Sequence, residues 1–315
     1  MSETPLPFDL QGHRGARGLR PENTLTGFAH ALATGVSTLE LDTGVTRDGV
    51  VVVSHDTALN PDHTRDASGR WLEGTGPTIF SLTLDQLQGF DVGRLRPGTA
   101  YAARFPEQVA VDGERIPRLA EVFDLVRKVG DAEVRFNIET KIDPRKPDAT
   151  PGPDAFTETL VREIRLAAME KRSMIQSFDW RTLGIVQKIA PEIETVCLTT
   201  QHGDDDNVGI GRPGPSPWLG GLDVNDFGGS VPKLVKAAGA SVWSPDFTEL
   251  TPQLVAEAHA LALRVIPWTA NHQDDMSRLI DMRIDGLITD RPDLLRRVLE
   301  QKGRRFRASP IIAPQ

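Results

Sequence analysis

Short apolar segments alternate with amphipathic segments along most of the chain. The apolar segments are rich in β-branched residues and are typical of buried strands, at 8–12, 38–43, 50–54, 133–139, 174–177, 195–198, 240–244, 264–268 and 286–289. In the intervening segments apolar residues recur at spacings of three and four, as in Phe156, Leu160 and Ile164. This period indicates helices, which we predict at 24–33, 119–129, 156–167, 179–189, 231–238, 254–261, 274–282 and 292–300.

The second and third strands are separated by a turn that contains Asp48-Gly49. Because Asp-Gly between apolar runs favours a tight turn, we expect 38–43 and 50–54 to form a hairpin. If the second strand of the hairpin is left out, eight strand–helix pairs remain. Alternating strands and helices favour a parallel sheet, and eight pairs need no second core if they close into a barrel. We therefore predict an α/β protein with one (β/α)8 TIM-barrel catalytic domain over residues 1–315.

One long stretch, 57–117, interrupts this rhythm after the hairpin. It is rich in Gly, Pro and Arg, and only one short helix is predicted in it, at 82–87. Long irregular segments inside a compact chain are usually functional, so we predict an insertion that lies over the barrel mouth. Five aromatic residues of this insertion are expected mainly to form its own small core, with the lining of a substrate pocket as the alternative: Trp71, Phe80, Phe90, Tyr101 and Phe105.

Composition excludes several classes of protein. The 315 residues include 36 Lys and Arg against 44 Asp and Glu, a net charge of −8, which argues against a nucleic-acid partner. The single cysteine, Cys197, excludes an internal disulfide. No apolar run approaches the roughly 20 residues that span a bilayer, so no stable membrane insertion is expected. Met1 to Pro7 lacks the basic and apolar parts of a signal peptide, so we expect a cytoplasmic protein, or a periplasmic or secreted one if a signal has been removed.

Polar residues gather where the predicted strands end. Glu40 and Asp42 are two positions apart, so a strand points both carboxylates to one face, and Glu139 ends another strand. The carboxyl ends of barrel strands converge on one face, where active sites lie. Further polar pairs and motifs follow other strands and would meet there too: His13-Arg14, Ser54-His55-Asp56, Gln176-Ser177, Trp268 to Asn271 and Thr289-Asp290.

The three carboxylates would repel one another in a partly dry site. Such repulsion raises their pKa values unless a cation lies between them, and all-oxygen ligands favour Mg²⁺ or Ca²⁺ over zinc. We therefore predict one divalent cation, Mg²⁺ or Ca²⁺, held by Glu40, Asp42 and Glu139. The alternative is that these acids form ion pairs with Lys141, Arg14 or other basic residues.

The motifs at these positions resemble those of the glycerophosphodiester phosphodiesterase family. They occur in the family's order over nearly the whole chain: Gly12-His13-Arg14-Gly15, Pro21-Glu22-Asn23-Thr24, Leu39-Glu40-Leu41-Asp42, Thr46-Arg47-Asp48-Gly49, Ser54-His55-Asp56, Asn137-Ile138-Glu139-Thr140-Lys141, Gln176-Ser177-Phe178, Trp268-Thr269-Ala270-Asn271 and Asp285 to Pro292. The resemblance implies metal-dependent hydrolysis of a small-molecule glycerophosphodiester to an alcohol and sn-glycerol 3-phosphate.

By the same resemblance, His13 and His55 are the catalytic acid/base pair, and the pattern does not decide which is the acid. Arg14 and Lys141 contact the phosphate. The substrate- and phosphate-binding set is completed by Gln176, Trp268 and Asn271. Five other histidines lack partner acids at useful spacing and are expected to be structural or solvent-facing: His30, His63, His202, His259 and His272.

Two other functions remain as alternatives. A lysophospholipase D-like enzyme would use the same site on lysophospholipids, and a wide apolar groove in the insertion would favour it over a small head group. A non-catalytic phosphoglycerol-binding protein is the less favoured alternative, because it would have little physical reason to keep both histidines and all three acids. The sequence indicates neither the preferred head group nor the oligomeric state.

Overall fold

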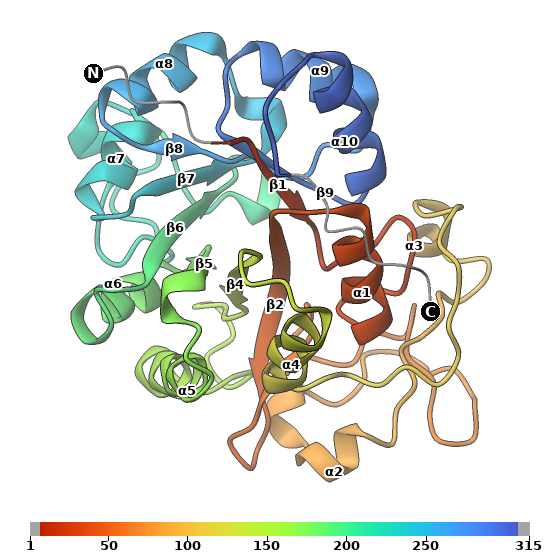
Figure 1. Ribbon diagram of the computed structural model, residues 1–315. Helices are drawn as coiled ribbons and strands as arrows, with labels where there is room; N and C mark the ends of the chain where they lie inside the picture. The colour runs from red at the N-terminus through yellow and green to blue at the C-terminus, as the bar shows by residue number, and fades with distance from the viewer. Residues whose placement is uncertain (1–6, 308–315) are drawn as a thin grey trace.

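The predicted barrel is confirmed by the computed structural model, which describes residues 7–307. Eight parallel strands lie in a ring at the centre, and helices surround them (Figure 1). Residues 1–6 and 308–315 lie outside the described residues, and they include most of the N-terminal segment on which the expected compartment rests.

The barrel strands follow the predicted segments closely. They are β1 (Asp9–Gly12), β2 (Thr38–Val45), β4 (Arg135–Thr140), β5 (Ser173–Ser177), β6 (Glu194–Thr199), β7 (Val242–Pro245), β8 (Arg264–Val265) and β9 (Gly286–Thr289). Their order is β8-β7-β6-β5-β4-β2-β1-β9. The ends of this order are joined by backbone hydrogen bonds, since the N–H groups of Asp285 and Ile288 donate to the carbonyl oxygens of Val265 (2.9 Å) and Pro267 (3.0 Å).

Each barrel strand is followed by a helix. The eight are α1 (Leu25–Thr34), α4 (Leu119–Val129), α5 (Pro153–Leu166), α6 (Trp180–Ile189), α7 (Val231–Ala237), α8 (Pro252–Ala260), α9 (Gln273–Asp281) and α10 (Pro292–Gln301). Thr24 caps α1, because its hydroxyl accepts a hydrogen bond from the N–H of Gly27 at 3.0 Å. The cap ends the loop that follows β1 and so helps to fix its path.

Alternation along the strands divides apolar from polar side chains. In β2, Leu39 and Leu41 face the outer layer and join the large core between strands and helices, while Glu40 and Asp42 face inward.

Inside the ring, one side is apolar and is filled by a separate cluster, Met174, Val196, Val242, Ile266 and Ile288. The other side is polar, as shown by Asn137, whose amide donates to Gln11 and Gln176 at 2.9 Å each. The polar side lies below the strand ends that carry the carboxylates.

The hairpin is also as predicted. Strand β3 (Val51–Val53) pairs with the end of β2 in the antiparallel direction, with Thr43 opposite Val53. This pairing brings the segment after β3, with His55, back to the carboxyl end of β2.

The insertion carries three short helical turns, where one was predicted. They are η1 (Ile79–Ser81), α2 (Leu84–Leu87) and α3 (Ala100–Ala103). An apolar cluster of its own holds the insertion together, with the buried residues Val52, Leu59, Ile79, Leu87, Val92 and Ile116. Figure 1 shows the insertion in orange and yellow beside α1 and below the barrel.

Strand β8 is shorter than the predicted segment 264–268. Pro267 has no N–H group and so interrupts the ladder. The hydrogen bonds to β7 nonetheless continue past it, since the N–H of Trp268 donates to the carbonyl of Pro245 at 3.0 Å. The segment therefore still delivers Trp268 to the strand end.

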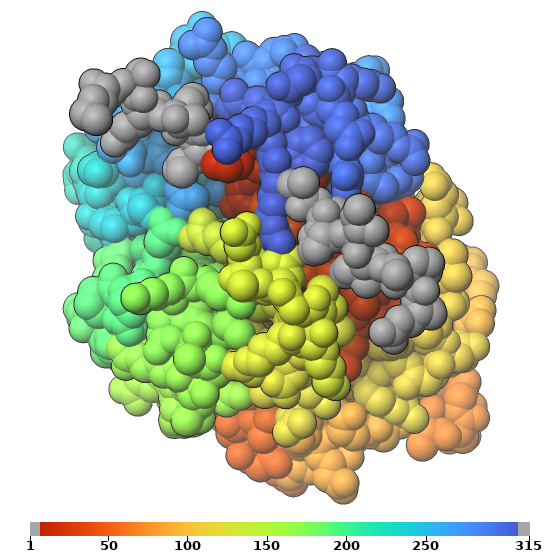
Figure 2. Space-filling view, viewed as in Figure 1, coloured from red at the N-terminus to blue at the C-terminus, as the bar shows by residue number. Residues whose placement is uncertain are grey.

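The first and last described segments lie together on the surface. The N–H of Phe8 donates to the carbonyl of Arg305 at 2.9 Å, and Figure 2 shows red N-terminal atoms against blue C-terminal ones. Within residues 7–307, none of the helices has the length and apolar character needed to cross a bilayer.

Candidate active site

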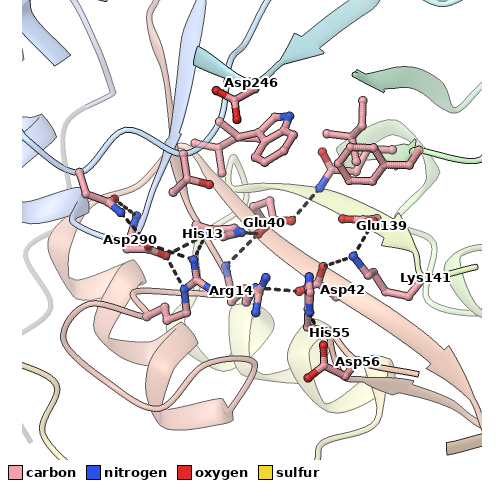
Figure 3. A pocket seen from close by; sticks show the side chains of 18 of the residues that line it. His13, Arg14, Glu40, Asp42, His55, Asp56, Glu139, Lys141, Asp246 and Asp290 are labelled. Carbon is pink, nitrogen blue, oxygen red and sulfur yellow. Dashed lines mark hydrogen bonds and ion pairs between the residues drawn. The ribbon is translucent and has the colours of Figure 1, made fainter. Parts of the chain in front are cut away.

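A cavity of about 500 Å³ lies at the carboxyl ends of the strands. All ten predicted site residues line it: His13, Arg14, Glu40, Asp42, His55, Glu139, Lys141, Gln176, Trp268 and Asn271. The insertion contributes Asn60, Tyr101 and Arg104 to the same lining. The structure thus brings together residues from the first to the last barrel strand (Figure 3).

A tight turn after β1 presents His13 and Arg14 to the cavity. A Cβ atom at Gly12 would lie 2.2 Å from the carbonyl oxygen of Gly15, and Gly15 has a φ of +88°, so both positions favour glycine. The turn aims the backbone N–H of Arg14 at Oε2 of Glu40, 2.8 Å away. One turn therefore fixes a histidine, an arginine and the orientation of a carboxylate.

The three carboxylates predicted to bind a metal lie close together. Glu40, Asp42 and Glu139 each offer an oxygen within 4.8 Å of the others, and all three residues are buried. Pairing of β2 with β4 sets Asp42 directly beside Glu139. The register of two neighbouring parallel strands therefore builds the cluster.

Burial and mutual repulsion disturb the ionisation of this cluster. Burial raises the pKa of Glu40 well above its usual value, and the neighbouring carboxylates Asp42 and Glu139 add to the effect. Burial also raises the pKa of Glu139 to about 7, against the opposing charge of Lys141. For Asp42 burial acts in the same direction, but neighbouring His55, Arg14 and Lys141 outweigh it, and its pKa is lowered. Two of the three acids thus lack full charge compensation from the protein alone.

Ion pairs with Arg14 and Lys141, the alternative to a metal, are present but incomplete. Nζ of Lys141 lies 2.8 Å from Oε1 of Glu139 and 3.8 Å from Oδ1 of Asp42, and Nε of Arg14 lies 3.3 Å from Oδ2 of Asp42. Oδ1 of Asp42 is buried and has no hydrogen-bond partner among the described residues. A buried carboxylate oxygen without a partner is costly, and it is the kind of atom that a cation ligates. The residues therefore fit a hard divalent cation as well as internal pairing.

His13 is oriented by Asp290, at the end of β9. Nδ1 of His13 lies 2.7 Å from Oδ1 of Asp290, and Nε2 points toward Glu40, with 3.9 Å to Oε2. Burial lowers the pKa of His13 to about 4, and Arg17 adds to this shift while Asp290 opposes it. His13 is therefore held neutral at neutral pH, with Nδ1 on the carboxylate and Nε2 in the cavity.

His55 has a similar arrangement on the other side of the cluster. Its Nδ1 lies 2.7 Å from Oδ1 of Asp56, and Asn60 donates to Oδ2 of Asp56 at 2.7 Å. Burial lowers the pKa of His55 to about 4, with Arg14 and Lys141 acting in the same direction. Each histidine thus has its own carboxylate on Nδ1 (Figure 3).

Three predicted substrate contacts are already engaged within the protein. Gln176 donates to Oε1 of Glu40 at 2.7 Å. Asn271 donates to Oδ2 of Asp290 at 2.7 Å, and its Oδ1 accepts from the N–H of Asp290 at 2.9 Å. Trp268 donates its indole N–H to the carbonyl of Ser244 at 2.9 Å and leaves its ring along the cavity. The amides of Gln176 and Asn271 therefore orient charged residues. Of these three side chains, only the Trp268 ring is left for contact with a ligand.

The sequence interpretation gave no role in the site to Arg17 or Glu22, and it named Tyr101 only as a possible pocket residue. Arg17 forms a fork with Asp290, with Nε at 2.7 Å from Oδ1 and Nη2 at 3.1 Å from Oδ2. Glu22 accepts from Nη1 of Arg14 at 2.7 Å and from the hydroxyl of Tyr101. Glu22 lies in one of the recognised family motifs, and that motif was the available signal. Tyr101 belongs to the insertion aromatics for which a pocket lining was the alternative, whereas nothing in the local pattern marks Arg17.

The insertion aromatics were expected either to form the insertion's own core or to line a substrate pocket, and the structure contains both cases. Tyr101 lines the cavity, as the less favoured expectation had it, while Phe90 packs on the insertion's own cluster. Phe105 is buried with its ring 4.7 Å from the guanidinium carbon of Arg17. None of the five histidines that were set aside lines this cavity.

Comparison with known proteins agrees with this geometry. Residues 13–294 match the model of the glycerophosphoryl diester phosphodiesterase family. A glycerophosphodiester phosphodiesterase of Caldanaerobacter subterraneus subsp. tengcongensis is 30% identical over 92% of this chain and 97% of its own length. A lysophospholipase D of Homo sapiens, GDPD1, is 24% identical over 91% of this chain and 84% of its own.

Solved structures give the same picture. A protein of Silicibacter pomeroyi, assigned to the glycerophosphoryl diester phosphodiesterases, superposes with a TM-score of 0.84 at 36% identity, covering 96% of each chain. An Oleispira antarctica phosphodiesterase, solved with the product sn-glycerol-3-phosphate, has a TM-score of 0.67 at 19% identity and covers 93% of this chain and 97% of its own, which shows the fold. The chain belongs to the glycerophosphoryl diester phosphodiesterase family, and the family and enzyme class expected from its motifs are confirmed.

Proposed function

We propose that this chain hydrolyses glycerophosphodiesters to an alcohol and sn-glycerol 3-phosphate in the cavity described above. One observation carries the proposal most directly: two histidines, each with a carboxylate on Nδ1, lie on either side of a buried cluster of three acids. A phosphodiester anion needs charge neutralisation and both a proton acceptor and a proton donor, and this cavity offers all of them.

Glu40, Asp42 and Glu139 would hold one divalent cation, Mg²⁺ or Ca²⁺. The all-oxygen donor set and the unpartnered Oδ1 of Asp42 support this assignment. When bound, the cation supplies positive charge next to the phosphoryl oxygens. Gln176 and the backbone N–H of Arg14 hold the Glu40 carboxylate in place for it.

His13 and His55 would exchange protons with the substrate. Both are neutral near pH 7, because burial lowers each pKa to about 4, so either can accept the proton of an attacking hydroxyl. The other must be protonated to supply the leaving alkoxide, and a bound phosphate anion would favour that form by raising its pKa. Arg14 and Lys141 lie beside the cluster as the cations that would contact the phosphate.

Activity assays with metal control test the proposal. Release of glycerol 3-phosphate from glycerophosphocholine should stop after exhaustive chelation by EDTA and return with Mg²⁺ or Ca²⁺. Full activity after chelation would refute the metal assignment, and no release with either ion from any glycerophosphodiester would refute the function.

Lysophospholipids are the second candidate substrate, because one of the relatives is a lysophospholipase D. The cavity lining favours the smaller substrate. The insertion residues that reach the cavity are polar or carry polar groups, namely Asn60, Tyr101 and Arg104. None of the residues of the insertion's apolar cluster lines this cavity. A parallel assay with lysophosphatidylcholine separates the two, and a higher kcat/KM for the lysolipid would reverse this order.

A further inference from the structure

A second cavity of about 400 Å³ adjoins the first on the side of His55 and Lys141. Both residues line the two cavities, and so do Phe178 and Trp268. The loop after β6 closes the second cavity with Trp218 and His202. A phosphodiester held at the carboxylate cluster would therefore extend one of its two ester groups into this space.

Aromatic rings form the apolar part of this second cavity. Phe178 and Trp268 meet edge to face, with centroids 5.4 Å apart, and Trp218 is the third ring of the lining. Two of the rings already have a cation near them: Nζ of Lys141 lies 5.9 Å from the Phe178 centroid, and Cζ of Arg145 lies 5.0 Å from the Trp218 centroid. The rings thus stand where cations can contact them.

The protein neutralises both of these cations. Lys141 pairs with Glu139, and Arg145 forms a fork with Asp143, at 3.0 Å from Nε to Oδ1 and 3.0 Å from Nη2 to Oδ2. Arg145 is therefore matched by an acid outside the space, and Lys141 faces the carboxylate cluster, where the phosphate is proposed to bind.

Two carboxylates of the lining are not matched in this way. Asp205 and Asp246 line both cavities, and neither has a lysine or arginine within 4.0 Å among residues 7–307, although the exposed Asp205 is one of the acids that raise the pKa of Arg145. Oδ1 of Asp246 accepts from the N–H and hydroxyl of Thr248, at 2.9 and 2.7 Å, while the nearest basic group to Oδ2 is His202, at 3.9 Å. Figure 3 shows the Asp246 carboxylate above the main cluster, away from Asp42 and Lys141.

We propose that the second cavity, lined by Phe178, Trp218, Trp268, Asp205 and Asp246, binds the alcohol part of the substrate and selects an ammonium head group, such as that of choline or ethanolamine. The inference rests on the proposed function and adds the class of leaving group. Aromatic faces and carboxylates without an ion pair together attract an organic cation, whereas the carboxylates would repel an anionic head group and attract a neutral one less strongly.

A substrate pair tests the selection. The kcat/KM of the metal-loaded enzyme for glycerophosphocholine should exceed that for glycerophosphoglycerol, which carries a neutral alcohol, by about tenfold or more. In a double variant that combines Asp205→Asn with Asp246→Asn this ratio should fall at least about tenfold, because both negative charges are removed while an amide oxygen at position 246 can still cap the turn at Thr248. Asp204→Asn is the matched control, since Asp204 neighbours Asp205 but lines neither cavity, and its ratio should equal that of the parent.

A ligand pair tests the same inference on the unaltered protein. Choline and 3,3-dimethylbutan-1-ol have nearly the same shape, and only choline is charged. Choline should inhibit hydrolysis of glycerophosphoglycerol competitively, with an inhibition constant at least about tenfold lower than that of the neutral alcohol. Equal inhibition by both alcohols, or equal kcat/KM for both substrates, would overturn the head-group inference while leaving the phosphodiesterase proposal intact. Absence of hydrolysis of every diester would instead overturn the proposed function.

Discussion

Oδ1 of Asp290 lies 2.7 Å from Nδ1 of His13, although 277 positions separate the two residues. The contact joins the first barrel strand to the last, which are hydrogen-bonded neighbours in the ring. Asp290 is only 1% exposed and receives donors from Arg17 and Asn271 as well. A carboxylate so surrounded stays ionised, since the charge of Arg17 and the contact with His13 outweigh burial and keep its pKa below the usual range.

We expect Asp290→Asn to reduce kcat by about a hundredfold or more with little change in KM. The amide offers one acceptor oxygen for which Arg17 and Asn271 compete, so its NH₂ group would face Nδ1 of His13 and favour the wrong tautomer. Steady-state kinetics against pH would show the loss together with an altered profile. Asp293→Asn, which alters a partly buried pair with Arg291 outside the cavity lining, is the control, and an unchanged kcat for Asp290→Asn would remove Asp290 from the mechanism.

His13→Ala and His55→Ala should each reduce kcat by at least about a hundredfold, because each removes one proton-transfer group. His259→Ala is the matched control, since His259 lies outside the cavity and contacts Asp285 at 2.9 Å. If either active-site variant kept activity close to that of the control, the acid/base role of that histidine would have to be withdrawn.

Metal should stabilise the protein more as the pH rises. The pKa of Glu139 is raised above its usual value to about 7, so without metal the folded protein holds this proton more tightly than the unfolded chain does. The proton therefore contributes to the stability of the fold at low pH, and this contribution is lost as the pH rises through 7. A cation competes with this proton, so the gain in Tm from excess Mg²⁺ or Ca²⁺ over EDTA should grow from about pH 5 to about pH 8.

At about pH 8, we expect saturating metal to raise the Tm by roughly 5 °C or more over EDTA, as measured by scanning calorimetry. Glu139→Gln should lose the gain, whereas Glu133→Gln, an exposed residue just before β4, should keep it. A pH-independent gain, or none, would contradict ligation by the buried cluster.

Tyr101→Phe should lower the free energy of unfolding by about 1–2 kcal/mol, because it leaves the buried carboxylate of Glu22 without one donor. Glu22 also accepts from Arg14, so we expect KM to rise as the arginine loses its fixed position. Urea denaturation and steady-state kinetics measure the two effects. Phe80→Leu, at an insertion residue outside the cavity lining, serves as the control for general loosening of the insertion. A variant with unchanged stability and KM would show that the Tyr101–Glu22 contact has no role in the site.

Much of the barrel and the carboxylate cluster could be predicted from the sequence, because both follow from local period and strand direction. Glu40 and Asp42 share a face by their spacing alone, and the parallel order then sets Glu139 beside them. The orienting roles of Gln176 and Asn271 could not be predicted in this way. Their partners, Glu40 and Asp290, are set by tertiary contacts across the ring, so a polar residue at a strand end does not reveal whether it faces a ligand or a neighbour.

The insertion was the least predictable part, for a physical reason. Helix α3 has only four residues, too short for any apolar period, and its position depends on contacts with Arg17 and Glu22 far along the chain. The prediction of strand 264–268 was too long because it ignored the missing N–H of Pro267.

The pairing of His13 with Asp290 has a consequence for synthesis of the protein. A chain emerging from the ribosome presents His13 277 residues before the carboxylate that orients it. Products that stop before Asp290 would therefore carry the three clustered acids without an aligned histidine, and hydrolytic competence would arrive only once the last barrel strand and Asp290 have been made.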